Sequence, residues 1–273
     1  MSATAYILGH APDELRRLDE QSAILRPATL GLMADCGLRP GMRVLDPGCG
    51  TGEVSLLLAE AVGPAGAVTG VDRGPEALEK ARDRAALGDA DHVTFLEDDI
   101  VTMTADEPFD AVVGRMVLMH QPDPAGVLAH LASLARPGAL VAFAEIVVLP
   151  ELLAVPQRPL MRRVVSLIDQ TLTLAGVHTR MGIGLHDAFA RAGLPVPAVR
   201  IEPLATCGED PAYTRWAVET LRTLLPVLEP LGVATPDEVA IETLPERLGA
   251  EAAAAGGVAV PCLMGTAWTC LAG

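Results

Sequence analysis

The stretch VLDPGCGTGEVSLLLAEA, residues 44–61, places an aspartate, three glycines and an apolar helical run within one short segment. Glycine-rich turns after a strand commonly bind phosphate, because bare backbone N–H groups can approach a ligand closely. Here Asp46 precedes the first glycine and Glu53 follows the last, and two negative charges at that range would repel a diphosphate. The segment therefore favours a ligand that carries positive charge and no phosphate.

Strand-like apolar runs alternate with helical patterns through residue 150. The runs are nearly continuous in Val, Leu, Phe and Ala, as is typical of strands buried on both faces of a parallel sheet. They cover residues 42–46, 67–72, 93–98, 109–114 and 139–148. Helical patterns lie between them, and one opens at Asp123 as an N-cap with Pro124 in the first helical position. Repeated strand–helix units predict right-handed crossovers and a doubly wound α/β sheet.

Helical patterns dominate the chain on both sides of this region. Residues 11–41 predict two helices that lead into the first strand. Beyond residue 150 further helices are expected over 158–176, 184–193, 211–232 and 235–257. Thr235 is expected to cap the last of these helices, and strands are expected at 196–208 and 258–273.

The expected organisation is one sheet domain with a helical cap. It comprises an N-terminal helical lid over 1–40, a ligand-binding core over 41–150, and a cap with the last sheet strands over 151–273. The first 34 residues also offer a surface on which a second copy of the chain could pack as a homodimer.

Composition narrows the class of partner. A formal net charge of −15 argues against nucleic acid and against an anionic membrane surface, and favours a small-molecule substrate. The five cysteines are odd in number and never in a CxxC spacing, so reduced thiols in a cytoplasmic protein are expected. The N-terminus lacks a signal-peptide layout, and Glu145, Pro150 and Glu151 interrupt the most apolar run, residues 139–155, so a membrane span is not expected there.

The glycine spacing differs from that of nicotinamide enzymes. A dinucleotide turn follows G-x-G-x-x-G, but from Gly48 this chain reads G-C-G-T-G, and Glu53 occupies the position of the last expected glycine. S-adenosylmethionine has an ammonium group, a sulfonium group and no phosphate, so the charge conflict disappears. Asp46 then suits its positive charge, either directly or through water.

The segment 44–59 resembles the first motif of class I S-adenosylmethionine-dependent methyltransferases, of the small-molecule type similar to the ubiquinone and menaquinone biosynthesis enzymes. The segments VTGVDRGPEALEKAR (68–82), VTFLEDDI (93–100) and FDAVVGRMVLMHQPDP (109–124) resemble that family's later motifs in order. Each motif includes the carboxyl end of a predicted strand, and open α/β sheets bind ligands at the edge that these ends form. The resemblance implies a seven-stranded, mostly parallel Rossmann-like methyltransferase sheet, with S-adenosylmethionine as cofactor and S-adenosylhomocysteine as product.

The resemblance also implies roles for single residues. Asp72 would take the ribose hydroxyls, which agrees with its spacing of about 20 residues from the loop. Asp99 would accept from the adenine amino group, with Asp98 beside it as the alternative. Tyr6 and Gln21 would close over the methionine end, unless they are ordinary surface residues of the lid. The full cofactor set is Tyr6, Gln21, Asp46, Gly48, Cys49, Gly50, Asp72, Arg73, Asp99, Ile100, Gly114 and Arg115.

Methyl transfer to a hydroxyl needs a base to take the acceptor's proton. His120 is the first candidate because its ordinary pKa suits a general base, with a pocket-shaping role as the alternative. Glu145 is the second; it either faces the acceptor or pairs with an arginine, because a lone buried carboxylate is costly. His178 and Arg180 in the cap are candidate acceptor contacts, and no histidine or acid pair shows metal-ligand spacing.

The sequence thus predicts methyl transfer from S-adenosylmethionine to a small molecule, at a hydroxyl or carbon of a secondary metabolite. One alternative keeps the fold and the cofactor but not the transfer, as a pathway cyclase or a binding module. A nicotinamide-dependent oxidoreductase is the other, and the spacing Gly48-Gly50-Gly52 speaks against it.

Overall fold

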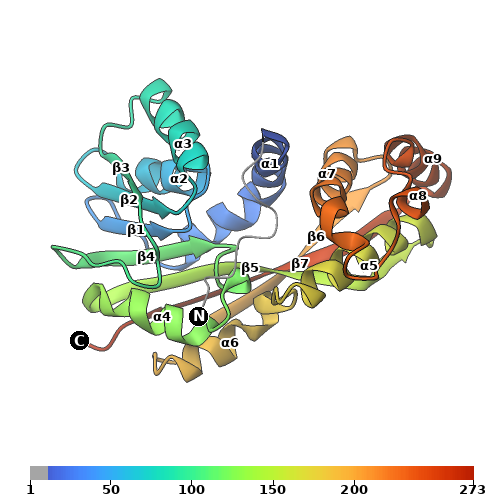
Figure 1. The fold of residues 1–273 in the computed structure, drawn as a ribbon. Coiled ribbons are helices and arrows are strands. Elements are labelled where there is room, and N and C mark those ends of the chain that lie inside the picture. The colour runs from blue at the N-terminus through green and yellow to red at the C-terminus, as the bar shows by residue number, and fades with distance from the viewer. Residues whose placement is uncertain (1–11) are drawn as a thin grey trace. The chain divides into compact units, whose positions relative to one another are not determined.

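The computed structural model describes residues 12–273 of the chain (Figure 1). Tyr6 therefore lies outside the described residues. The seven strands of the sheet are β1 (Arg43–Pro47), β2 (Ala67–Asp72), β3 (Val93–Glu97), β4 (Phe109–Arg115), β5 (Ala135–Val155), β6 (Ala198–Cys207) and β7 (Val258–Cys270). All the predicted strands are confirmed, although β5 begins before and ends after the predicted 139–148.

The strand order is β3-β2-β1-β4-β5-β7-β6. Strand β1 pairs in parallel with β2 on one side and with β4 on the other, and the pairs β2–β3 and β4–β5 are also parallel. The order of strands thus reverses at β1, and the carboxyl ends of β1, β2 and β4 share one edge. In open α/β sheets this reversal marks the crevice that binds ligands.

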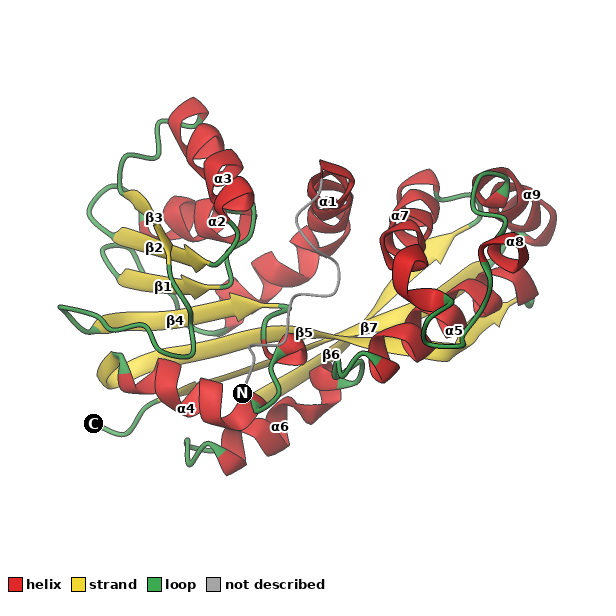
Figure 2. Cartoon of the chain, in the orientation of Figure 1, coloured by secondary structure: helices red, strands yellow, loops and turns green. Residues whose placement is uncertain are grey.

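Helices cover both faces of this part of the sheet, as expected of a doubly wound fold (Figure 2). Helices α2 (Glu53–Val62) and α3 (Pro75–Leu87) lie on one face, and α4 (Pro124–Ser133) and α6 (Met181–Arg191) lie on the other. The predicted N-cap of α4 is confirmed, since the Asp123 side chain accepts a hydrogen bond from the N–H of Gly126. Buried side chains such as Leu45 and Val112, both 0% exposed, fill the interior.

The chain divides into two compact units. The core unit comprises Arg26–Glu145, Met181–Ile201 and Gly265–Gly273. The helical unit comprises, among the described residues, 12–25, Ile146–Arg180 and Glu202–Met264. This division differs from the predicted one, because α6, which the sequence places in the cap, packs against α4 in the core unit.

The helical unit holds α5 (Pro159–Leu174), α7 (Pro211–Leu228), α8 (Pro236–Val239) and α9 (Leu244–Ala255), and α5 contacts both α7 and α9. The predicted helix 235–257 is wrong in one respect: Ala240, at φ +48°, ends α8 after one turn and a new helix starts at Leu244. Thr235 caps α8 as predicted, in a capping box with Glu238.

The prediction of two helices over 11–41 is also wrong. A single helix, α1 (Pro12–Asp35), contains Pro27 within it. Proline removes one backbone hydrogen bond from a helix, but Leu25 and Ala28 are buried on either side of it, so packing outweighs that loss. Among residues 12–273, no helix combines the length and apolar character that crossing a membrane requires.

Candidate functional site

The glycine loop, residues 48–52, follows β1 and has a backbone conformation that residues with a side chain seldom adopt. Gly48, Gly50 and Gly52 have φ values of +68°, +53° and +77°. A Cβ atom on Gly48 would lie 2.9 Å from Cγ2 of Val117, whereas a Cβ on Gly50 would meet nothing within 4 Å. The loop therefore packs tightly at Gly48 and is open at Gly50, where a ligand can approach the backbone.

Asp72, at the end of β2, ties this loop to the neighbouring strand. Its Oδ2 accepts from the N–H of Gly50 at 2.8 Å, and its Oδ1 accepts from the N–H of Gly74 at 2.9 Å. The N–H of Cys49 also donates to the carbonyl of Val71 at 3.0 Å. Because each carboxylate oxygen can accept more than one hydrogen bond, the half-buried Asp72 retains acceptor capacity toward a ligand.

Asp46, in β1 just before the loop, is buried rather than exposed to a ligand at Gly50. Its carboxyl is 1% exposed, and the Oγ of Ser55 donates to its Oδ2 at 2.6 Å. Burial raises the pKa of Asp46 to about 7, although the hydrogen bond from Ser55 opposes that shift. Asp46 is therefore a partly protonated group near neutral pH rather than the bare anion that the sequence implied.

Glu53, the second acid at the loop, is neutralised by arginine. Nη2 of Arg115, at the end of β4, lies 2.6 Å from Oε2 of Glu53, and Nη1 of Arg115 donates to Oγ1 of Thr29 at 2.9 Å. Arg26 lies 3.9 Å from the same carboxylate. Asp46 and Glu53 flank the turn as predicted, but Glu53 is paired and Asp46 is buried, so their charges act on a ligand less strongly than the sequence implied.

The carboxyl end of β3 brings Arg73 and Asp99 together. Nη1 of Arg73 lies 3.6 Å from Oδ2 of Asp99, and both side chains are partly exposed. Asp98 is exposed and accepts from the N–H of Asp99, while its own N–H donates to the carbonyl of Asp72. Ile100 is buried. Strand ends β2 and β3 are therefore joined at the place where the sequence expects the adenosine part to bind.

Two of the remaining predictions fall on β4 and β5. A Cβ on Gly114 would lie 2.5 Å from the ring of Phe143, so Gly114 makes room for a buried side chain. Glu145 is 0% exposed, and its carboxylate accepts from the N–H groups of Val117, Leu118 and Met119. Burial raises the pKa of Glu145 to about 7, against the opposing effect of these hydrogen bonds.

His120 closes η1 (Leu118–His120), the short helical turn held by Glu145. His120 is half-buried, and its backbone N–H donates to the carbonyl of Val117 at 3.2 Å. The sequence offered pairing with an arginine as one of two roles for Glu145. In the described part of the chain, backbone N–H groups occupy its carboxylate instead.

Three predicted residues belong to the helical unit. Gln21 is buried and accepts from Nη1 of Arg17 at 2.7 Å. His178 is exposed, and Arg180 pairs with Asp169 of α5 at 2.9 Å. These three residues thus belong to the helical unit, whereas the glycine loop belongs to the core unit.

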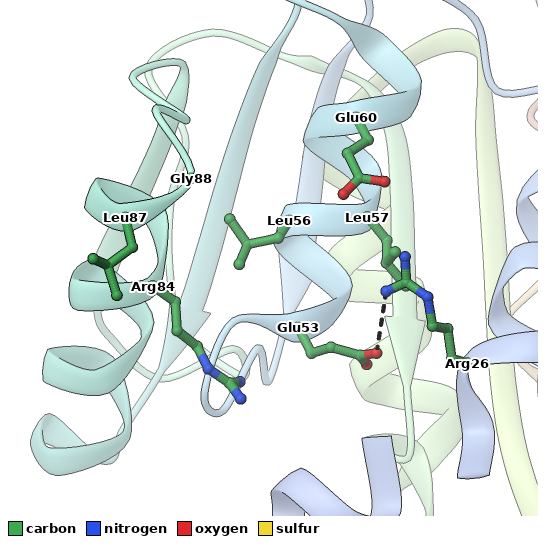
Figure 3. Close-up of a pocket in the computed structure, with 8 residues that line it drawn as sticks. All are labelled: Arg26, Glu53, Leu56, Leu57, Glu60, Arg84, Leu87 and Gly88. Atoms are coloured by element: carbon green, nitrogen blue, oxygen red, sulfur yellow. Dashed lines mark ion pairs between the residues drawn. The ribbon is translucent and has the colours of Figure 1, made fainter. Parts of the chain in front are cut away.

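A surface pocket of about 420 Å³ lies between α2, α3 and Arg26 (Figure 3). None of the predicted site residues is among its lining residues. Two of the residues that line the pocket also support the glycine loop. Nη1 of Arg84 donates to the carbonyl and the hydroxyl of Thr51, within the loop, at 3.1 and 3.0 Å. Glu53, directly after the loop, pairs with Arg115.

Sequence reasoning missed several residues that shape the loop, namely Ser55, Thr29, Arg84 and Val117. Ser55 stands in the first turn of α2 and donates to Asp46, and a polar residue between the apolar Val54 and Leu56 was the available signal. The other contacts link positions far apart in the chain, such as Thr29 with Arg115, and no local pattern marks them.

A mostly parallel sheet whose strand order reverses at β1, with a glycine loop after β1 and acids at or just beyond the ends of β2 and β3, defines a Rossmann-like α/β protein. In such folds, this edge of the sheet is where ligands commonly bind. A family model described as a methyltransferase domain matches residues 38–174, half of the chain. The chain belongs to this methyltransferase-domain family.

Curated relatives agree with this family. The chain is 36% identical over 135 residues to an arsenite methyltransferase of Halobacterium salinarum, covering 47% of this chain and 34% of that protein. It is 38% identical over 117 residues to a ubiquinone biosynthesis O-methyltransferase of Xanthomonas campestris, covering 42% and 47%. The match thus spans about half or less of the length of these relatives.

One solved structure resembles the fold over nearly the whole chain. It is a putative methyltransferase from Bacillus halodurans, with a TM-score of 0.60 at 15% identity, covering 90% of this chain and 100% of that one. At this identity the likeness supports the fold alone.

Proposed function

We propose that the protein is an S-adenosylmethionine-dependent methyltransferase that acts on a small molecule, at a hydroxyl or carbon of a secondary metabolite. The observation that carries the proposal is the glycine loop, open at Gly50 and tied to Asp72, in a chain of the methyltransferase-domain family. Membership in the family supports the reaction class, and the formal net charge of −15 favours a small-molecule acceptor over a nucleic acid.

The residues at the strand ends fit the cofactor. The open space at Gly50 admits a ligand against the backbone, and the remaining acceptor capacity of Asp72 suits two ribose hydroxyls. Asp99, with Arg73 beside it, would meet the adenine. When bound, S-adenosylmethionine supplies a methyl group on a positively charged sulfur, which leaves as a neutral sulfide.

Fewer carboxyl groups at the loop favour a cationic ligand than the sequence implied. Glu53 is paired with Arg115 and Asp46 is buried with a pKa of about 7, so neither contributes a full unpaired negative charge. Asp99 lies 3.6 Å from Nη1 of Arg73, so the charge that still disfavours a diphosphate at Gly50 is that of Asp72. Because a nicotinamide cofactor carries such a diphosphate, a nicotinamide oxidoreductase is the less favoured of the two functions.

His120 is the proposed base for a hydroxyl acceptor. It is half-buried at the end of η1, whereas Glu145 is fully buried with both oxygens facing backbone N–H groups, so an acceptor proton would reach His120 more readily. His178 and Arg180 are proposed acceptor contacts within the helical unit. A cytoplasmic location accords with a small-molecule substrate.

Methyl-labelled cofactor tests this proposal. Purified protein is incubated with labelled S-adenosylmethionine and a panel of phenolic, carboxylic and polyketide acceptors, together with arsenite and quinols, the substrate types that the relatives' names indicate. Label should appear in at least one acceptor and be lost in Asp72→Asn but not in Asp83→Asn, an exposed acid on α3. If the protein binds the cofactor but converts a substrate equally well with S-adenosylhomocysteine, a cyclase or binding role replaces methyl transfer.

A further inference from the structure

The carboxylate of Glu145 is the common partner of three consecutive backbone N–H groups. Its Oε1 accepts from Val117 at 2.9 Å and from Leu118 at 2.8 Å, and its Oε2 accepts from Met119 at 3.3 Å. These three residues are buried, as is Glu145 itself. A buried backbone N–H that loses its acceptor carries a large cost, so the carboxylate determines where this segment of chain lies.

The segment leaves β4 in a conformation that depends on such support. Met116, which directly precedes it, has a φ of +55°, a left-handed value that a residue with a side chain seldom adopts. The N–H of Met116 donates to the carbonyl of Ala144, next to Glu145 in β5, at 2.8 Å. Strand β5 thus holds the chain at four consecutive positions, 116–119.

The same segment forms one wall of the glycine loop. Val117 is 5% exposed, and its Cγ2 lies 2.9 Å from the place where a Cβ on Gly48 would stand. His120 follows at the end of η1, one residue beyond Met119. A shift of the chain at Val117 would therefore move both the support of the loop at Gly48 and the backbone that carries His120.

We propose that Glu145 is a positioning residue, which uses its carboxylate to hold residues 117–119 as the wall of the cofactor loop and to fix the backbone of His120. This inference rests on the proposed function, because the loop is taken to bind S-adenosylmethionine. It replaces the direct acceptor contact that the sequence suggested for Glu145. A glutamine at this position would keep one oxygen but turn an amide NH2 toward a backbone N–H, so part of the anchor would be lost.

The test compares Glu145→Gln with Asp110→Asn. Asp110 is a suitable control because it also accepts a backbone N–H, from Arg43 at 2.8 Å, but stands at the opposite end of β4. Binding of S-adenosylhomocysteine is measured by calorimetry, and exchange of the amides of residues 116–120 by hydrogen–deuterium exchange. Glu145→Gln should weaken binding at least about tenfold and speed exchange of these amides, whereas Asp110→Asn should leave binding within about twofold.

Val117→Ala provides a second variant should Glu145→Gln fail to fold. It leaves every hydrogen bond of Glu145 in place and removes the methyl groups that face Gly48, so it should weaken binding severalfold. Unchanged binding in Val117→Ala, or unchanged binding or unchanged exchange of amides 116–120 in a folded Glu145→Gln variant, overturns the inference. Absence of binding by the wild-type protein instead overturns the proposed function, and the exchange measurement still decides whether Glu145 anchors the segment.

Discussion

Two alanine substitutions in the glycine loop should separate packing from ligand access. Gly50 and Gly52 both have positive φ values, +53° and +77°, so alanine costs about 1–2 kcal/mol at either position through the backbone alone. The effect of alanine on the unfolded chain is the same at both sites and cancels in the comparison.

The surroundings of the two glycines differ. A Cβ on Gly52 would lie 2.8 Å from Cβ of Ala81 and 2.9 Å from Cζ of Phe95, and both neighbours are buried. Overpacking of this kind adds about 1–3 kcal/mol, so Gly52→Ala should lower the free energy of unfolding by about 2–5 kcal/mol in total. A Cβ on Gly50 meets nothing within 4 Å, so Gly50→Ala should cost only the backbone part.

Binding should rank the two variants the other way. The open space at Gly50 is where the cofactor is proposed to approach the backbone, so Gly50→Ala should weaken binding of S-adenosylhomocysteine at least about tenfold despite its milder effect on stability. Urea denaturation and calorimetry on the same preparations supply both measurements. The reasoning is refuted if Gly50→Ala destabilises the protein as much as Gly52→Ala does, or if it binds S-adenosylhomocysteine as tightly as the wild type.

Three further predictions concern single side chains. Burial raises the pKa of Asp46 from 3.8 to about 7, so between these values the folded protein holds a proton that the unfolded chain releases. The free energy of unfolding of the wild type, relative to that of Asp46→Asn, should therefore fall by about 2 kcal/mol between pH 5 and pH 7.5. Urea denaturation at both pH values measures this difference, and a flat or rising difference would contradict the prediction. Glu53→Gln should lower the free energy of unfolding by about 1–3 kcal/mol because it breaks the nearly buried pair with Arg115, whereas Glu60→Gln, an exposed acid in the same helix, should change it by less than about 0.5 kcal/mol. Thr235→Ala removes the capping box of α8 and should cost about 0.5–2 kcal/mol, with faster amide exchange at residues 236–239, while Thr214→Ala in α7 serves as the comparison; equal exchange in the two variants would argue against a capping role.

The parallel part of the fold was predictable because its signals are local. Strands β1, β2 and β4 are short, largely buried apolar runs, and β3 is a short apolar run at the edge of the sheet. The helices that follow these strands begin and end at residues with clear capping chemistry, such as Asp123 and Gly63. Deviations arose where tertiary packing overrode a local signal. Pro27 should have divided α1 but did not, and Ala240 carries no sequence mark of the left-handed turn that separates α8 from α9.

The candidate site was predictable in its positions but not in its contacts. The sequence placed Gly50 and Asp72 at neighbouring strand ends, and the hydrogen bond between them follows from that topology. It did not show that Glu53 is neutralised by Arg115, because the two are far apart along the chain. Nor did it reveal the partners of Glu145, since these are backbone N–H groups that any residue type would supply.

Calorimetric titration of the wild-type protein tests the central claim most directly. S-adenosylmethionine, S-adenosylhomocysteine, NADH and NADPH are titrated separately, with Asp72→Asn as the matched variant because Asp72 holds the N–H groups of Gly50 and Gly74. The account predicts saturable binding of both adenosyl compounds, weakened at least about tenfold in Asp72→Asn, and no binding of either dinucleotide. Saturable binding of NADH or NADPH together with no heat from S-adenosylmethionine or S-adenosylhomocysteine would contradict it.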